Sequence, residues 1–211
     1  MKKFFYVSVL SALLLAACGS ETVEDPKQEP KKVEEVSAEE TKPIETTSVD
    51  EEEEEIEEVV FTVADAYDYD IPEITEDILE LDKTSYAFIN ANTDIFPAKE
   101  EASITKLKGM VNSDIAYKHL NKNVTPYLEN IISVSGTVIS IEEYPENNVT
   151  LVHVTDDDLN SYVGLMYKLA DDVFEEDYVT LWGAPIGPWH FENIAGGTTN
   201  VQFLATSHIE K

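Results

Sequence analysis

The side chains that could do chemistry in this sequence are not spaced as a catalytic framework. The four histidines are His119, His153, His190 and His208. None has the His-x-x-His or Glu-x-x-His spacing of a metal hydrolase, and no serine lies in a Gly-x-Ser-x-Gly context. Adjacent acids such as Glu142 and Glu143 are expected by chance in a chain of net charge −29. We therefore predict a protein that is not an enzyme and that holds no metal or cofactor.

One acidic run resembles part of a calcium-binding loop. Residues 156–160 place side-chain oxygens at the first, third and fifth positions. The sixth position is Ser161 where such a loop needs glycine, and the twelfth is Tyr167 where it needs glutamate. A solvated hairpin turn is the favoured interpretation, and cation binding is the alternative.

The most suggestive binding segment is aromatic. Residues 185–193 carry the rings of Trp189, His190 and Phe191 between glycine and proline residues, and we expect them to form a loop between the fourth and fifth strands. Large rings in such a loop can grip a sugar or an apolar side chain of a partner. We predict these three residues, together with Tyr162, as ligand-binding residues. The alternative is that Trp189 and Phe191 fold over the end of a barrel as core.

The first residues read as an export signal. Three residues with two lysines precede an apolar run from Phe4 to Leu15, which is shorter than the roughly 20 residues that span a bilayer. Residues 15–18, Leu-Ala-Ala-Cys, resemble the lipobox of bacterial lipoproteins. The resemblance implies cleavage after residue 17, lipid (diacylglycerol and palmitate) on Cys18, and a place on the outer face of the cell membrane. Cys18 is the only cysteine, so intramolecular disulfides are excluded.

Composition separates a linker from a folded part. Residues 21–60 hold 17 acids and 4 lysines, a net charge of −13, with few apolar side chains, so we predict a disordered acidic linker over residues 18–60. Residues 61–211 hold 26 acids and 8 lysines, a net charge of −18. No arginine occurs anywhere, and lysine does not replace its planar fork in phosphate recognition.

Hydrophobic periodicity predicts an α+β fold. A helical segment is expected over residues 61–128, with a capping aspartate at Asp70 three residues before Glu73. The expected helices cover residues 71–82, 85–90, 99–111 and 114–121. From residue 129 the period changes to two, which predicts five strands. The expected strands cover residues 131–142, 148–155, 162–168, 178–183 and 201–209, with one or two helical turns at 169–176. Gly136, inside the long first strand, indicates a strand that bends around a small closed barrel.

Three loose motifs carry a family resemblance. They are residues 117–123 ahead of Tyr127 and 134–138, residues 176–183, and Gly196-Gly197. They resemble the OB-fold domains of the tRNA-anti-like kind found in exported lipoproteins of Gram-positive bacteria. The resemblance implies that an oligomeric or protein ligand binds the face of strands 2 and 3 and the connecting loops. Where this family has Gly-Asp, the chain has Glu176-Asp177.

Charge and fold together lead to a functional prediction. Between Lys122 and the C-terminal residue the only cation is Lys168, whereas nucleic-acid binding draws on rows of basic side chains, so we predict no nucleic-acid partner. We expect a membrane-anchored, non-catalytic module for a protein or envelope component. The alternatives are an enzyme of unrecognised type and a sensor of small ligands or cations.

Overall fold

The computed structural model describes residues 60–211. The predicted signal peptide, Cys18 and the linker up to residue 59 lie outside the described residues. Within residues 60–211, no helix combines the length and the apolar composition needed to cross a membrane.

The first half of the described chain is helical, as expected. The helices are α1 (Val63–Thr75), α2 (Lys83–Ala91), α3 (Glu101–Gly109), α4 (Tyr117–Lys122) and a 3-10 turn, η1 (Thr125–Tyr127). The side chain of Asp82 caps α2 by accepting a hydrogen bond from the backbone of Thr84, and the helix ends at Asn92. The helix expected over 114–121 begins only at Tyr117.

The expected boundaries of the first helix are wrong. Helix α1 begins eight residues earlier than expected, because the capping box is formed by Thr62 and Asp65 and not by Asp70 and Glu73. Pro72 lies inside its last turn. The helix ends at Glu76, which adopts a left-handed conformation, and residues 76–82 form a turn and a connecting segment.

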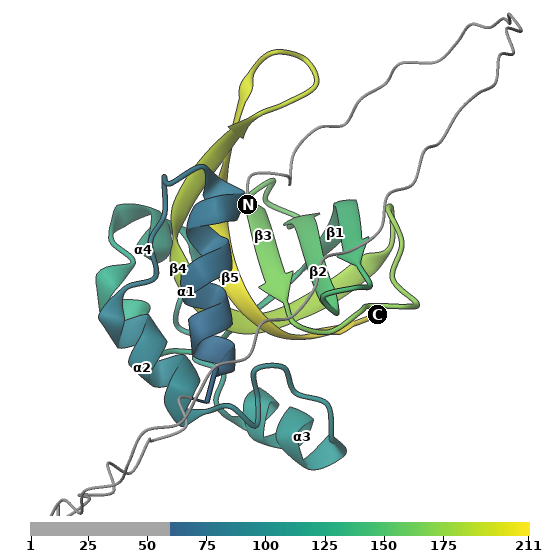
Figure 1. Cartoon of the computed structure of the whole chain (residues 1–211). Helices are drawn as coiled ribbons and strands as arrows, with labels where there is room; N and C mark the ends of the chain where they lie inside the picture. Colours follow the sequence, from purple (N-terminus) through teal and green to yellow (C-terminus); the bar gives the residue numbers. More distant parts are fainter. Residues whose placement is uncertain (1–59) are drawn as a thin grey trace, which may run out of the picture. The chain divides into compact units, whose positions relative to one another are not determined.

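The second half forms a closed five-stranded barrel (Figure 1). The strands are β1 (Ile132–Tyr144), β2 (Val149–Thr155), β3 (Ser161–Met166), β4 (Tyr178–Glu192) and β5 (Thr198–Glu210). Their order around the barrel is β1-β2-β3-β5-β4, and only the β3–β5 pair is parallel. The predicted α+β fold with an OB-like barrel is confirmed.

Gly136 bends β1 as predicted. β1 pairs with β4 from Ile132 to Thr137 and with β2 from Thr137 to Tyr144, so it serves both sides of the barrel. A Cβ atom on Gly136 would lie 2.3 Å from the backbone oxygen of Thr155. Only a residue without a side chain permits this approach.

The segment expected to hold helical turns, residues 169–176, has none. Its backbone bonds are isolated turns, such as the one from the Val173 N–H to the Ala170 carbonyl. The side chains of Ala170 and Val173 instead close one end of the barrel, where they pack with Val138 and Leu181. The apolar residues of this segment are therefore explained by their contact with the barrel and not by the periodicity of a helix.

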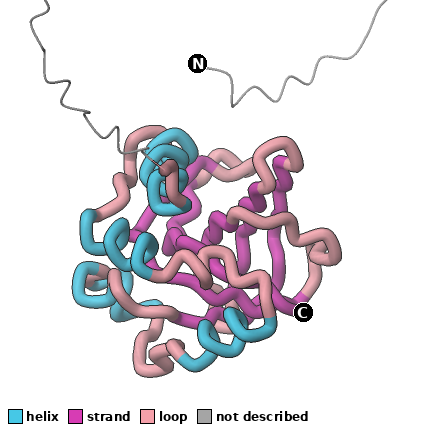
Figure 2. Tube along the Cα trace, turned by 60° about the horizontal axis from the view of Figure 1, so that its bottom comes forward, coloured by secondary structure: helices cyan, strands magenta, loops and turns pink. Residues whose placement is uncertain are grey.

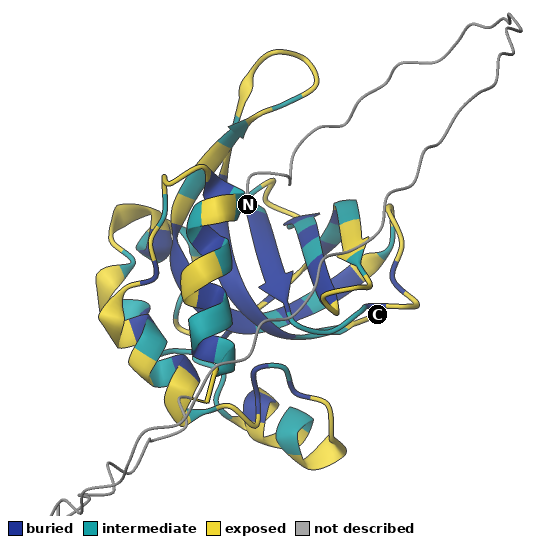
Figure 3. Cartoon of the chain, viewed as in Figure 1, coloured by how far each residue is buried: buried dark blue, intermediate teal, exposed yellow. Residues whose placement is uncertain are grey.

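The expected loop at residues 185–193 is also wrong, because β4 continues through it to Glu192. β4 loses β1 as a neighbour after Gly183 and keeps β5 on its other side. Pro185 and Pro188 therefore sit in a strand with a free edge, where a missing N–H is tolerated. The resulting β4–β5 hairpin projects beyond the rest of the barrel (Figures 1 and 3), and its turn is residues 193–197.

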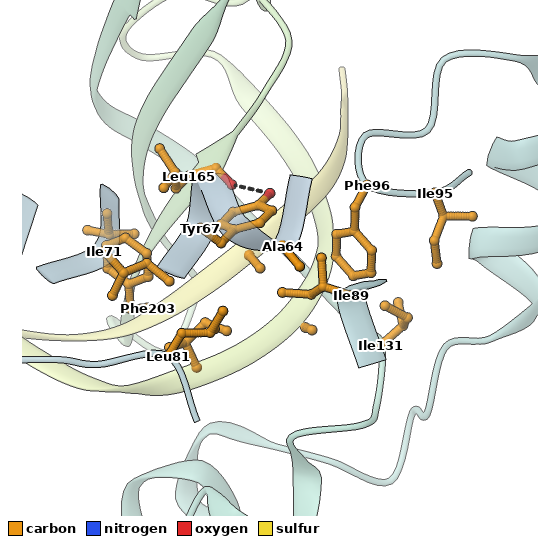
Figure 4. Packing of buried hydrophobic residues seen from close by; sticks show 14 of the residues in the cluster. Ala64, Tyr67, Ile71, Leu81, Ile89, Ile95, Phe96, Ile131, Leu165 and Phe203 are labelled. Carbon is orange, nitrogen blue, oxygen red and sulfur yellow. Dashed lines mark hydrogen bonds between the residues drawn. The ribbon is translucent and has the colours of Figure 1, made fainter. Parts of the chain in front are cut away.

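The helices lie around one side of the strands (Figure 2). The buried side of α1 carries Ala64, Tyr67 and Ile71, which pack on the outward side chains of Leu165 and Phe203 (Figure 4). Helix α4 closes the other end of the barrel, where Leu120 packs against inward-facing residues of β1, β3 and β5. The helical segment and the barrel thus share one core.

Candidate functional site

Helix α1 covers part of the barrel face that the family resemblance predicted as the ligand face. The Tyr67 hydroxyl lies 3.1 Å from the carbonyl oxygens of both Leu165 and Thr206. Its ring meets the Tyr167 ring edge-on, with centroids 4.7 Å apart. The Tyr167 hydroxyl in turn donates to Asp70 at 2.8 Å. A ligand cannot lie on this part of β3 unless α1 moves away, so the connecting turns remain as the accessible part of the predicted site.

Two of the predicted site residues, Trp189 and Phe191, belong to an aromatic cluster on the outer barrel wall. We define this cluster as His153, Trp189, Phe191 and Phe203. The ring centroids of Trp189 lie 5.2 Å from Phe191 and 5.9 Å from Phe203, and those of His153 and Phe191 are 5.6 Å apart. Both Trp189 and Phe191 are half-buried. Their packing fixes the base of the projecting hairpin to the barrel.

Two polar atoms of the aromatic cluster are buried without a hydrogen-bond partner among the described residues. They are the Trp189 Nε1 and the His153 Nε2. Burial lowers the pKa of His153, because the charged imidazolium is poorly solvated there. The cluster therefore behaves as an apolar surface at neutral pH.

His190 does not join these rings. Side chains alternate along a strand, so His190 projects from the opposite face of β4 to Trp189, in register with Asn200. It is exposed. The three neighbouring rings expected to act together are thus divided between two faces of the hairpin.

Two exposed apolar side chains stand at the end of the barrel from which the hairpin projects, which we call the hairpin end. Because β3 and β5 are parallel with Tyr162 opposite Gln202, the β2–β3 turn (residues 156–160) and the β4–β5 turn (193–197) lie at this same end. Leu159 is exposed in the first turn and Ile194 is fully exposed in the second. Because these side chains are exposed, they add little to the stability of the fold.

The acidic turn is a self-contained structure. One Asp156 oxygen accepts hydrogen bonds from the N–H groups of Asp158 and Asn160, and the other accepts from the Asn160 amide. Within residues 60–211 no group of three or more histidine, cysteine, aspartate or glutamate side chains could hold a metal ion. The carboxylate at the first position of the calcium-like run is engaged in shaping the turn.

Tyr162, the fourth predicted site residue, lies on the other side of the barrel wall from the aromatic cluster. It is 4% exposed and packs with Leu204 and Val134 inside the barrel end closed by α4. Part of it lines a groove of about 550 Å³ between α4 and the acidic turn. Tyr117 lines the same groove and meets Tyr162 edge-on, with ring centroids 5.5 Å apart. The pairing could not be predicted from the sequence, because the two tyrosines are 45 positions apart and only Tyr117 lies in one of the three motifs.

The geometry defines a five-stranded OB-like barrel whose outer face at β3 and β5 is partly covered by its own first helix. No protein-family model matches the chain. No curated protein matches it either. Among solved structures, the chain is similar to a mitochondrial single-stranded DNA-binding protein from S. cerevisiae, with 15% identity over 38% of this chain and 89% of that one and a TM-score of 0.28. It is also similar to an OBody bound to hen egg-white lysozyme, with 21% identity over 38% of this chain and 91% of that one and a TM-score of 0.25.

One prediction is corrected by these comparisons. The prediction of no nucleic-acid partner is contradicted by the similarity to a single-stranded DNA-binding protein. The scarcity of cations was the basis of that exclusion, and the exclusion is withdrawn.

Proposed function

We propose that this chain is a non-catalytic binding module, held on the outer face of the cell membrane by lipid on Cys18, which docks a protein of the envelope at the hairpin end of the barrel. The observation that carries the proposal is Ile194. It is a fully exposed isoleucine at the tip of a hairpin whose base is held by packed aromatic rings. A pre-organised apolar tip loses little conformational entropy on binding.

The turn at the tip supports this proposal because it is well defined. The Asn193 side-chain oxygen accepts hydrogen bonds from the N–H groups of Ala195 and Gly197, at 3.1 and 3.0 Å. The Gly197 carbonyl accepts from the Asn193 N–H. These hydrogen bonds order the backbone on both sides of Ile194 and hold this residue at the tip of the hairpin.

The negative charge of this part of the chain indicates which charges surround the apolar contact on the partner. No lysine occurs from residue 169 to residue 210, a stretch that contains seven acids and the whole β4–β5 hairpin. A partner with an apolar pocket for Ile194 and a basic rim would be attracted by this field and would be held in register by it.

Site-specific photo-cross-linking in intact cells tests the proposal. A photoreactive residue at position 194 is expected to capture one defined envelope protein. The same residue at Asn147, an exposed position in the β1–β2 turn at the opposite end of the barrel, is the matched control and is expected to capture nothing above background. Ile194→Asp is expected to abolish capture from a neighbouring cross-linker position such as Ala195.

Two results would overturn the proposal. One is equal capture at positions 194 and 147, which would mean that the hairpin end is not selective. The other is a mobility shift of single-stranded oligonucleotides by the whole chain that Ile194→Asp removes, since this would make nucleic acid the ligand of the hairpin end.

A further inference from the structure

The groove beside Tyr162 is lined by several polar and charged side chains, and these are not needed to pack the hairpin or the hydrophobic core. Its walls are the start of β1, the segment leading into α4, and the acidic turn. Five of the side chains in its lining are those of Tyr117, Tyr162, Asp156, Asp158 and Lys118. It is a separate place from the aromatic cluster, because Tyr162 faces into the barrel and Trp189 faces out.

Electron-rich groups converge in this groove. Burial, and after it the Asp156 carboxylate, raises the pKa of the Tyr162 hydroxyl. The same two causes raise the pKa of the Tyr117 hydroxyl. Asp158 adds a second carboxylate close enough to raise the pKa of Tyr162 as well. Two neutral phenols and two carboxylates therefore share one concave surface.

Part of this polarity is unused. Asp156 is engaged within its own turn, but the Asp158 carboxylate accepts no hydrogen bond from the described residues. Asp158 lines the same groove as Tyr162, so its carboxylate is a free acceptor for a ligand that donates hydrogen bonds.

Lys118 is the only cation in the lining, and it is exposed. None of the salt bridges formed by the described residues involves it. Its ammonium group therefore forms no salt bridge with Asp158, and the two carboxylates of the lining outnumber this one cation.

We propose that this groove is a binding site for a primary ammonium group. The ammonium would donate to Asp158 and lie against the tyrosine rings, which attract cations through their negative faces. A lysine side chain and an amino sugar both carry this group, and the test separates these two sources. The proposal does not depend on what binds the hairpin end.

The test is an NMR titration of the whole mature chain, followed at the amide signals of Asn160 and Tyr162. The probes are Nα-acetyl-lysine methylamide and glucosamine, and the neutral comparison is Nα-acetyl-norleucine methylamide, which has an aliphatic side chain without the ammonium. Saturable binding with a dissociation constant on the order of millimolar is expected for at least one amine and not for the neutral compound. Whichever amine saturates identifies the source.

Three variants separate a site from a general charge effect. Asp158→Asn is expected to weaken amine binding roughly five- to tenfold, as the loss of a direct charge partner does. Asp157→Asn is the matched control, since this adjacent carboxylate lies outside the groove, beside the Tyr178 hydroxyl, and its change should alter binding less than about twofold. Lys118→Gln is expected to tighten binding, because it removes a like charge.

Equal weakening by Asp157→Asn and Asp158→Asn would overturn the proposal, since it would reduce the effect to net charge. Equal shifts with the norleucine compound would overturn it too. Unchanged folding of the variants is checked by their amide spectra, so that a lost signal is not mistaken for lost binding.

Discussion

Tyr67 on α1 places its hydroxyl 3.1 Å from the carbonyl oxygen of Leu165 on β3, and so fixes the first helix across the barrel wall (Figure 4). Its ring is completely buried, packs edge-on against Phe96 and Tyr167, and burial raises its pKa far above the ordinary value, so it remains a neutral donor. The helix is therefore part of the folded barrel unit.

Tyr67→Phe tests how much this hydrogen bond contributes. The substitution keeps the ring and leaves a buried carbonyl without its donor, so the free energy of unfolding is expected to fall by about 1–2 kcal/mol. Urea denaturation measures it. Tyr69→Phe, on the same helix but exposed, is the control and is expected to change stability by less than about 0.5 kcal/mol. Equal effects of the two substitutions would show that the Tyr67 hydroxyl contributes nothing.

Asp70, one turn further along α1, is expected to make stability depend on pH. Burial, the largest effect, raises the pKa of Asp70 above its ordinary value of 3.8; the hydrogen bond from Tyr167 opposes this and Glu73 adds to it. A raised pKa in the folded state means that its stabilising contribution is complete below pH 3.8 and is lost as the pH rises through the folded pKa.

Asp70→Asn should therefore increase the free energy of unfolding at neutral pH, since an amide oxygen still accepts from Tyr167 without a buried charge. The gain is expected to disappear in acid, where the wild-type carboxyl is neutral in both states. Urea denaturation over a series of pH values measures this, with the exposed Asp68→Asn as control. A loss of stability at neutral pH in Asp70→Asn would show that the charged hydrogen bond outweighs burial.

Substitutions of Trp189 and of Ile194 should distinguish a residue that stabilises the hairpin from a residue that contacts a partner. Trp189→Ala removes a ring packed on Phe191 and Phe203 and is expected to lower the free energy of unfolding by about 2–4 kcal/mol. Ile194→Ser removes a fully exposed side chain and is expected to change it by less than about 0.5 kcal/mol. Thermal unfolding monitored by circular dichroism distinguishes them. A stable Trp189→Ala variant would restore this ring as a candidate contact residue.

The barrel was predictable from sequence because local signals agreed with its topology. Gly136 within an alternating apolar strand marked the bend in β1, and that bend follows from a contact no side chain could make. The hairpin was mistaken for a loop because Pro185 and Pro188 normally interrupt strands. The strand tolerates both prolines because β4 extends beyond the end of its pairing with β1. This is a property of the assembled barrel and not of the segment.

The covering of the barrel wall by α1 and the groove beside Tyr162 could not be predicted for a different reason. Tyr67 lies before the helix expected over residues 71–82, and its bond to a strand almost a hundred residues away depends on tertiary packing. Tyr117 and Tyr162 likewise meet only because α4 closes the barrel end. Sequence periodicity identifies which residues are buried, but does not identify their partners.

The lipid anchor is tested at Cys18. With serine in its place, thioether attachment of lipid cannot occur, so Cys18→Ser is expected to appear in the medium or as uncleaved precursor. Fractionation of cells followed by immunoblotting measures this, and Ser37→Ala in the acidic segment is the control that should behave as wild type. Processing and membrane association of Cys18→Ser equal to wild type would exclude the anchor.

Gly164 and Thr206 should show strong energetic coupling inside the barrel. A Cβ atom on Gly164 would lie 2.3 Å from the Thr206 side-chain oxygen, which is buried and has no hydrogen-bond partner among the described residues. Gly164→Ala is therefore expected to lower the free energy of unfolding by about 1–3 kcal/mol. Thr206→Ala removes both the obstacle and an unsatisfied polar atom, so the double variant should be more stable than Gly164→Ala alone. Urea denaturation of the four proteins gives the coupling energy, and strictly additive effects would show that β3 relieves the contact by a backbone shift instead.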